Sequence, residues 1–199
     1  EKTYGVGVYM RIGIDLDGVV FNSENYIASF IELTYMDKIV DGELNFKSSS
    51  TKKRYNIPDA DFDTILKVYE ESVSKSPLMP FVKEALDYLK SQGHELYIIT
   101  ARGRISKKHI SLTKRRLIKE RIKADGYCFS QTDKANTCKM LGIDIMIDDD
   151  YNVVESVSKS VIKCFQFISD RMLLVKNKNV EPVYNWGEIC RKIKIIEKR

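Results

Sequence analysis

One stretch decides the fold of this 199-residue chain: Arg11-Ile12-Gly13-Ile14-Asp15-Leu16-Asp17-Gly18-Val19-Val20. Its first part is apolar at nearly every position, which predicts a strand at 11–16 that is buried on both faces of a parallel sheet. Asp15 and Asp17 stand one residue apart at the strand end, so their side chains point the same way. Such paired anions repel each other unless a cation lies between them or one is protonated. Gly18 allows a sharp turn and a close approach to a ligand, although an ordinary Asp-Gly turn is the structural alternative.

Short apolar runs alternate with amphipathic helical patterns along the rest of the chain, as in α/β proteins. Further strands are predicted at 95–100, 127–129, 144–147 and 161–165. Helices are predicted at 81–92, 105–123 and 134–141, the first of them between Pro80 and Gly93. We therefore expect an α/β fold with a three-layer α/β/α Rossmann-like core and a parallel sheet.

Residues 22–79 interrupt this alternation, with helical patterns at 25–36 and 62–73 and no convincing strand. Structureless connections of this length are uncommon, so we expect a small α-helical cap inserted after the first strand rather than a long helical crossover. The core domain would then comprise residues 10–21 and 80–199. Residues 1–9 carry no pattern that joins the first strand, and we expect them to be a tag or a disordered extension.

The composition limits the class of protein. Lys and Arg number 33 against 28 Asp and Glu, 43% of the residues are hydrophobic, and no apolar stretch approaches the roughly 18 residues of a membrane span. No signal-peptide pattern opens the chain, so we expect a compact cytoplasmic protein without a membrane partner. Four cysteines without a CxxC pair and only two histidines argue against zinc and favour reduced, structural cysteines.

Polar groups that suit phosphate chemistry follow two more predicted strands and begin one helix. Thr100 ends the strand at 95–100, the carboxylates of residues 148–150 follow the strand at 144–147, and Lys134 opens the helix at 134–141. Ligands of open parallel sheets bind outside the carboxyl ends of the strands. These groups include acids that can bind a metal, a hydroxyl and an amine that can bind anionic oxygens, and a carboxylate that can attack as a nucleophile. Together they indicate a phosphoryl-transfer site.

In order and context these residues resemble the four motifs of the haloacid dehalogenase-like superfamily of phosphatases, namely Asp15-Leu16-Asp17-Gly18, Thr100, Lys134 and Asp148-Asp149. The resemblance covers nearly the whole chain after Met10. Flanking residues look like those of the 5′(3′)-deoxyribonucleotidase group and its bacterial relatives, namely Thr100-Ala101-Arg102 and Val183-Tyr184-Asn185-Trp186. Ala101 stands where some nucleotidases carry a second hydroxyl, so one phosphate contact is expected to be missing or to come from the backbone.

The resemblance implies a nucleophile and a proton carrier. Asp15 would attack phosphorus to form an aspartyl-phosphate, and Asp17 would act as general acid and then as general base. Mg²⁺ would be held by the Asp15 carboxylate, the Asp17 backbone carbonyl and Asp148, with waters and a phosphate oxygen.

The resemblance also implies how the phosphoryl group is held. Thr100 and Lys134 would bind its oxygens, and Ala101 and Arg102 would add contacts to the substrate. Asp149 would orient Lys134 or a metal-bound water, while Gly18 would support the turn.

Ten Lys and Arg residues between 102 and 123 face one acid, Glu120. A nucleic-acid surface is one interpretation of this stretch. We favour a solvated helix face, with Ile105, Leu112 and Ile118 on its buried side, because no stacking aromatics interrupt the stretch. His109 is expected at the surface. Arg102 and Arg104 are expected near the ligand site at the carboxyl ends of the strands.

In the cap, Phe46, Tyr55 and the basic run 52–54 could close over a leaving group. Tyr26, Phe30 and Tyr35 are instead expected in the core of the cap.

The sequence thus predicts a Mg²⁺-dependent phosphomonoester hydrolase, a 5′-nucleotidase acting on (deoxy)ribonucleoside monophosphates. A phosphatase for a sugar or polyol phosphate, or for a nucleic-acid terminal phosphate, is the alternative. A phosphate-sensing module such as a receiver domain is disfavoured because its paired acids come early in the chain, whereas here they follow Lys134. The expected partner is a small-molecule phosphomonoester, and a homodimer is left open.

Overall fold

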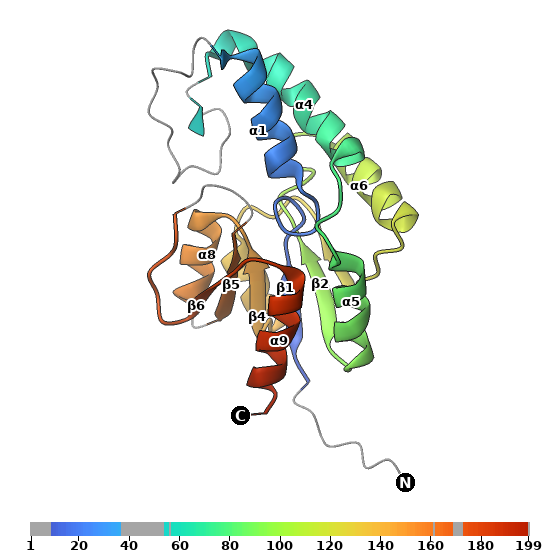
Figure 1. Ribbon diagram of the computed structural model, residues 1–199, viewed down its shortest axis with the longest axis vertical. Coiled ribbons are helices and arrows are strands. Elements are labelled where there is room, and N and C mark those ends of the chain that lie inside the picture. Colours follow the sequence, from blue (N-terminus) through green and yellow to red (C-terminus); the bar gives the residue numbers. More distant parts are fainter. Residues whose placement is uncertain (1–8, 37–53, 56, 161, 169–172, 199) are drawn as a thin grey trace.

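The computed structural model describes residues 9–36, 54–55, 57–160, 162–168 and 173–198 (Figure 1). Its centre is a six-stranded sheet in the order β3-β2-β1-β4-β5-β6, and every neighbouring pair of strands is parallel. The strands are β1 (Arg11–Ile14), β2 (Glu95–Ile99), β3 (Gly126–Cys128), β4 (Ile145–Asp148), β5 (Lys163–Phe167) and β6 (Val180–Val183). The parallel α/β fold is therefore confirmed.

Two apolar clusters cover the two faces of the sheet. Ile12 and Ile145 pack with α5 (Val82–Ser91) and α9 (Trp186–Ile196). Met146 points to the other face, where it packs with α7 (Lys134–Leu141) and α8 (Tyr151–Ser158). This alternation along β4 produces the expected three layers.

Strand β6 was not predicted from the sequence. Its residues, Val180-Glu181-Pro182-Val183, include a proline and an acid, which weaken the strand pattern. The strand lies at the edge of the sheet, where proline is tolerated because one side of the backbone needs no ladder hydrogen bonds.

Helix α6 (Lys107–Lys119) is shorter than predicted and buries a different face. Its buried side consists of His109, Thr113 and Leu117, which share one face at a spacing of four residues. Ile105 and Ile118, predicted to be inside, are 59% and 76% exposed. The prediction of a surface His109 is also wrong, and burial lowers the pKa of its imidazole.

The described part of residues 22–79, here called the helical module, contains α1 (Ser23–Thr34), a 3₁₀ turn, η1 (Asp59–Asp61), and α4 (Phe62–Lys75). In Figure 1, α1 and α4 lie side by side above the sheet. The module has its own apolar cluster, which includes Ile27, Ile31 and Tyr35. Residues 37–53, with Phe46 and most of the basic run, lie outside the described residues, as do residues 1–8.

The two connections between sheet and helical module run beside each other. The Asn22 backbone N–H donates to the Pro77 carbonyl at 2.8 Å, and the Met79 N–H donates to the Val20 carbonyl at 2.8 Å. A further contact lies at the end of α4, where the Arg116 guanidinium on α6 donates to the backbone carbonyls of Ser74 and Ser76. The module is thus joined to the core at one pair of strand-like segments and along α6.

The remaining sequence predictions concern cysteines and membranes. All four cysteines are free thiols, as expected. Within the described residues, no helix combines the length and the apolar character needed to cross a membrane.

Candidate active site

The sheet brings the predicted chemical groups to one edge. Strand β1 pairs with β2 and β4 so that Ile14 lies opposite Ile98 and Ile147. The residues at or just after the carboxyl ends of these strands therefore lie at the same edge of the sheet. They are Asp15, Thr100, Asp148 and Asp149, and all four are buried.

Lys134 joins two of these residues. It is the first residue of α7, whose N-terminus is capped by the Asp133 side chain accepting from the Asn136 N–H. Its Nζ lies 2.9 Å from Asp15 Oδ1 and 2.7 Å from Asp148 Oδ2. Burial opposes the lysine charge, but Asp148 and Asp15 outweigh burial and raise the lysine pKa. The amine is therefore a fixed cation at this edge.

Three carboxylates converge beside that amine. Asp15, Asp148 and Asp149, here called the carboxylate cluster, each offer an oxygen, and these oxygens lie within 4.8 Å of one another. Burial raises the pKa of all three carboxyls, to about 7 for Asp148. Asp15 Oδ1 is buried without an aligned hydrogen bond. One lysine leaves this cluster short of positive charge, and its hard oxygen donors suit a divalent cation such as Mg²⁺.

Gly18 makes room for the cluster. Its φ is +70°, which glycine adopts without strain. A Cβ placed on Gly18 would lie 2.0 Å from Asp149 Oδ2. Asp149, expected to orient Lys134 or a metal-bound water, packs against Gly18 and belongs to the three-carboxylate cluster.

Asp17, two residues after Asp15, is not one of the three clustered carboxylates, and its side chain binds Arg102. Nε and Nη2 of Arg102 donate to Oδ2 and Oδ1 of Asp17 at 2.9 and 2.6 Å, and Ser23 Oγ donates to Oδ1 at 2.6 Å. Burial would raise the pKa of Asp17, but the Arg102 guanidinium, with Ser23 and Lys134, outweighs burial and lowers it. Arg102 and Ser23 thus favour the ionised form of the Asp17 carboxylate, the form that results once Asp17 has given up a proton.

The remaining candidate residues follow β2 along the chain. Some of them are exposed and others are buried. Thr100 Oγ1 accepts from the Arg102 backbone N–H at 3.2 Å, and Ala101 is exposed. The Arg102 side chain, expected at the substrate, is only 4% exposed and is occupied by protein groups. Arg104 is exposed on the loop before α6.

Tyr55 and Arg54, the described members of the set expected to close over a leaving group, are buried inside the helical module. The Tyr55 ring is buried in the module's apolar cluster, and its hydroxyl donates to Glu32 Oε1 at 3.2 Å. Arg54 is buried, with Nη1 3.7 Å from Glu24 Oε2. The interpretation of Tyr55 as a stacking group for a leaving group is therefore not supported, whereas Tyr35 packs in the cluster as expected.

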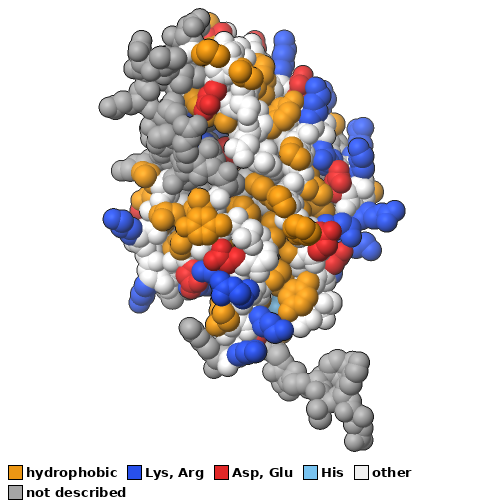
Figure 2. Space-filling model, in the orientation of Figure 1, with side chains coloured by type: hydrophobic (Ala, Val, Ile, Leu, Met, Phe, Trp, Pro, Cys, Tyr) orange, Lys and Arg blue, Asp and Glu red, His pale blue; other side chains and the backbone are white. Residues whose placement is uncertain are grey.

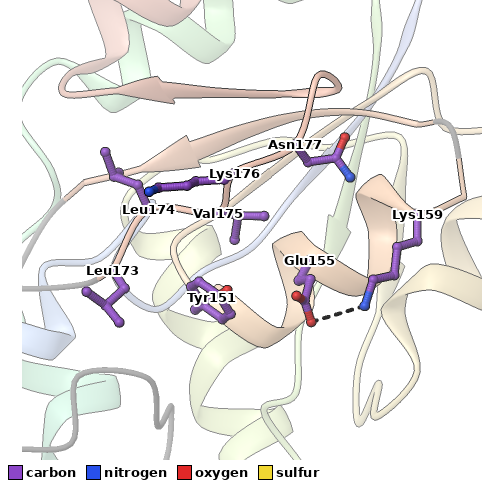
Figure 3. Close-up of a pocket in the computed structure, with 8 residues that line it drawn as sticks. All are labelled: Tyr151, Glu155, Lys159, Leu173, Leu174, Val175, Lys176 and Asn177. Carbon is purple, nitrogen blue, oxygen red and sulfur yellow. Dashed lines mark ion pairs between the residues drawn. The ribbon is translucent and has the colours of Figure 1, made fainter.

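Two surface features lie apart from the carboxylate cluster. Figure 2 shows Lys and Arg side chains gathered over α6. A cavity of about 450 Å³ lies between α8 and the segment after β5. Figure 3 shows the residues that line it. Its walls are Tyr151, Glu155 and Lys159 on one side and Leu173, Leu174, Val175, Lys176 and Asn177 on the other. None of the predicted site residues lines this cavity.

Comparisons with known proteins agree with this fold. No family model matches the chain. Over 185 residues it is 24% identical to a nucleotidase of Clostridium acetobutylicum, covering 90% of this chain and 91% of that protein. A predicted phosphatase of the same organism superimposes with a TM-score of 0.65 at 18% identity, covering 94% of this chain and 99% of that one.

A haloacid dehalogenase-like hydrolase of Streptococcus pneumoniae superimposes with a TM-score of 0.63 at 15% identity, covering 92% of this chain and 98% of that one. The chain therefore has the fold of haloacid dehalogenase-like hydrolases, and the resemblance predicted from the motifs is confirmed at that level.

Proposed function

We propose that this protein is a metal-dependent phosphomonoester hydrolase that works through an aspartyl-phosphate. The observation that carries the proposal is the buried carboxylate cluster, which shares one lysine at the carboxyl ends of β1 and β4. Buried anions in excess of cations are costly without a compensating ion. A site of this kind suits a divalent cation together with a phosphoryl group.

Asp15, Asp148 and Asp149 would hold Mg²⁺ through their carboxylates, and the Asp17 backbone carbonyl would contribute as the motif resemblance implies. Bound Mg²⁺ supplies positive charge that neutralises the cluster and polarises the phosphoryl group. The space that Gly18 leaves for Asp149 supports this assignment.

In the first step, Asp15 attacks phosphorus and the bond from phosphorus to the leaving oxygen breaks. Asp17 supplies the proton that this oxygen takes up. Lys134 and Thr100 contact the phosphoryl oxygens and stabilise the charge that spreads over them. The Lys134 amine is already fixed by its contacts with Asp15 and Asp148, so it needs little reorganisation.

In the second step, Asp17 takes a proton from water while the water oxygen bonds to phosphorus. The bond from phosphorus to the Asp15 oxygen breaks, which releases phosphate and regenerates the Asp15 carboxylate. A base must begin this step ionised, and the contacts of Asp17 with Arg102 and Ser23 favour that form.

The substrate class we propose is nucleoside 5′-monophosphates, with residues 22–79 acting as a cap over the leaving group. The nucleotidase of C. acetobutylicum, which matches over nine tenths of both chains, supports this choice. The alternative is a small phosphomonoester other than a nucleotide, such as a sugar or polyol phosphate, because structures of similar fold include a predicted phosphatase named for a non-nucleotide substrate, the phosphoglycolate phosphatase of Haemophilus somnus. A panel of nucleotides, sugar phosphates and 3′-phosphorylated oligonucleotides, compared by kcat/KM, separates these classes.

Asp15→Asn tests the nucleophile. We expect turnover of p-nitrophenyl phosphate and of nucleotides to disappear while the folded state is retained, and EDTA to silence the wild type. Asp150→Asn is a matched control, because Asp150 caps α8 through the Asn152 and Val153 N–H groups and asparagine caps equally well. Wild-type turnover by Asp15→Asn would contradict the assignment.

A further inference from the structure

The carboxylate of Asp17 has a defined free position. An ionised carboxylate offers about four acceptor positions, two on each oxygen. Oδ1 accepts from Ser23 Oγ and from Arg102 Nη2, and Oδ2 accepts from Arg102 Nε. Counting contacts from the part of the chain that the structure describes, one position remains, on Oδ2. The Asp17 side chain is 34% exposed, so a small molecule can reach the carboxylate.

Arg102 is itself held from several sides. Its Nη1 donates to Thr113 Oγ1 at 3.3 Å, and its guanidinium carbon lies 4.8 Å from the centre of the Phe21 ring. Its backbone N–H donates to Thr100 Oγ1. The guanidinium is therefore locked in one place, and its contact with Asp17 fixes the plane of that carboxylate.

We propose that Arg102 is a positioning residue that, together with Ser23, directs Oδ2 of Asp17 toward the water that hydrolyses the aspartyl-phosphate. The inference rests on the proposed function and replaces direct substrate binding as the role of Arg102. In the step concerned, Oδ2 takes one proton from water, the water oxygen bonds to phosphorus, and the bond to the Asp15 oxygen breaks. Phosphate leaves, and the proton on Asp17 is returned to solvent or to the next leaving group.

The geometry of the contact requires arginine. A guanidinium presents two parallel N–H donors to both oxygens of a carboxylate, whereas the ammonium of lysine acts as a point charge without this fork. Arg102→Lys thus preserves the charge and removes the orientation. Correct placement of a general base contributes strongly to the reaction rate, because a small misplacement of the reacting atoms lowers the rate by a large factor.

p-Nitrophenyl phosphate isolates the water step, because p-nitrophenolate is a good leaving group and needs no proton from Asp17. With Arg102→Lys we expect kcat to fall about 10–100-fold, a part of what general base catalysis contributes. The first step stays fast, so a burst of p-nitrophenol of about one equivalent should appear. Acid-quenched protein should then carry phosphate on most molecules, whereas the wild type carries it on a minor fraction.

Arg116→Lys is the matched control. The Arg116 guanidinium carbon also lies over the Phe21 ring, at 5.4 Å, but this arginine binds Ser74 and Ser76 carbonyls and Glu120 rather than Asp17. We expect it to lower thermal stability without raising the phosphorylated fraction. Ser23→Ala removes one donor to Oδ1 with little change in volume and should raise the phosphorylated fraction less than Arg102→Lys does. This second variant keeps the test valid if Arg102→Lys does not fold.

A slow Arg102→Lys or Ser23→Ala variant with a phosphorylated fraction no higher than that of the wild type would overturn the inference. A wild-type protein without activity toward any phosphomonoester would overturn the proposed function itself. The two failures are therefore distinguishable.

Discussion

Three buried carboxylates gather at the carboxyl end of the sheet, where one lysine contacts two of them, whereas the helical module above the sheet is held by an apolar cluster of its own. At the sheet end, charge is concentrated where burial makes it costly. In the module, the buried side chains are mainly apolar, and pairs such as Lys75 with Glu71 lie in solvent. The contrast supports the proposal that the sheet end performs the chemistry, while the module is stabilised by packing of its own.

Replacing Lys134 by methionine tests the sheet end most severely. The change leaves Asp15 and Asp148 buried without their cation, and breaking a buried pair in this way costs about 3–5 kcal/mol. We expect turnover of p-nitrophenyl phosphate to fall by about 10³-fold, and Mg²⁺ to raise the melting temperature more in the variant than in the wild type. Scanning fluorimetry with and without Mg²⁺ measures the second effect. Unchanged turnover would remove Lys134 from the site.

Ile31→Ala tests whether the helical module is stabilised by its own cluster. Ile31 is fully buried on α1, and such a truncation costs about 2–5 kcal/mol. Hydrogen exchange should accelerate in α1 and α4 and remain slow in β1 and β4, while p-nitrophenyl phosphate turnover stays within about threefold. Uniformly faster exchange throughout the sheet would show that module and core unfold together, and the comparison would fail.

Gly18→Ala introduces a methyl group where Asp149 packs. Backbone strain at φ +70° and the overlap with Asp149 act together, so we expect a loss of about 2–3 kcal/mol and a weaker affinity for Mg²⁺. Gly93→Ala is the control, because its φ is +92° and nothing lies within 4 Å of an added Cβ. It should cost about 1 kcal/mol and leave Mg²⁺ affinity unchanged. Denaturant titration and calorimetry measure the two quantities, and equal effects of both substitutions would argue against the packing of Asp149 on Gly18.

The pH dependence of stability provides the smallest test. Burial raises the pKa of Asp148 to about 7, so the folded state retains a proton that the unfolded chain loses near pH 4. The metal-free protein should therefore lose stability as the pH rises from about 4 to about 7. Asp148→Asn should lose less over this range when both are melted in EDTA. Parallel pH profiles for the two proteins would show that Asp148 does not carry this proton.

The sequence predicted that Asp15 and Asp148 lie close together, although it did not predict Asp149 as the third clustered carboxylate. Asp15 and Asp148 follow apolar strands, and the ends of parallel strands meet at one edge, so their proximity follows from the pattern. The position of Lys134 could be predicted in the same way, because it begins the helix that comes directly before the strand of Asp148.

Other contacts could not be predicted from local patterns. Arg102 reaches Asp17 across 85 residues, and no spacing rule specifies that a guanidinium rather than a substrate meets this carboxylate. The buried face of α6 was also misassigned, since His109 and Thr113 are polar and obscure the period of four residues. Tertiary packing decided both cases.

The central claim is that Asp15 becomes phosphorylated during turnover. Wild-type protein mixed with Mg²⁺ and p-nitrophenyl phosphate, quenched in acid within the first turnover and digested, should yield a peptide containing Asp15 with one added phosphoryl group. The same peptide from Asp15→Asn protein should carry none. Turnover without a phosphorylated peptide under these conditions, or a phosphoryl group on another residue, would contradict the account.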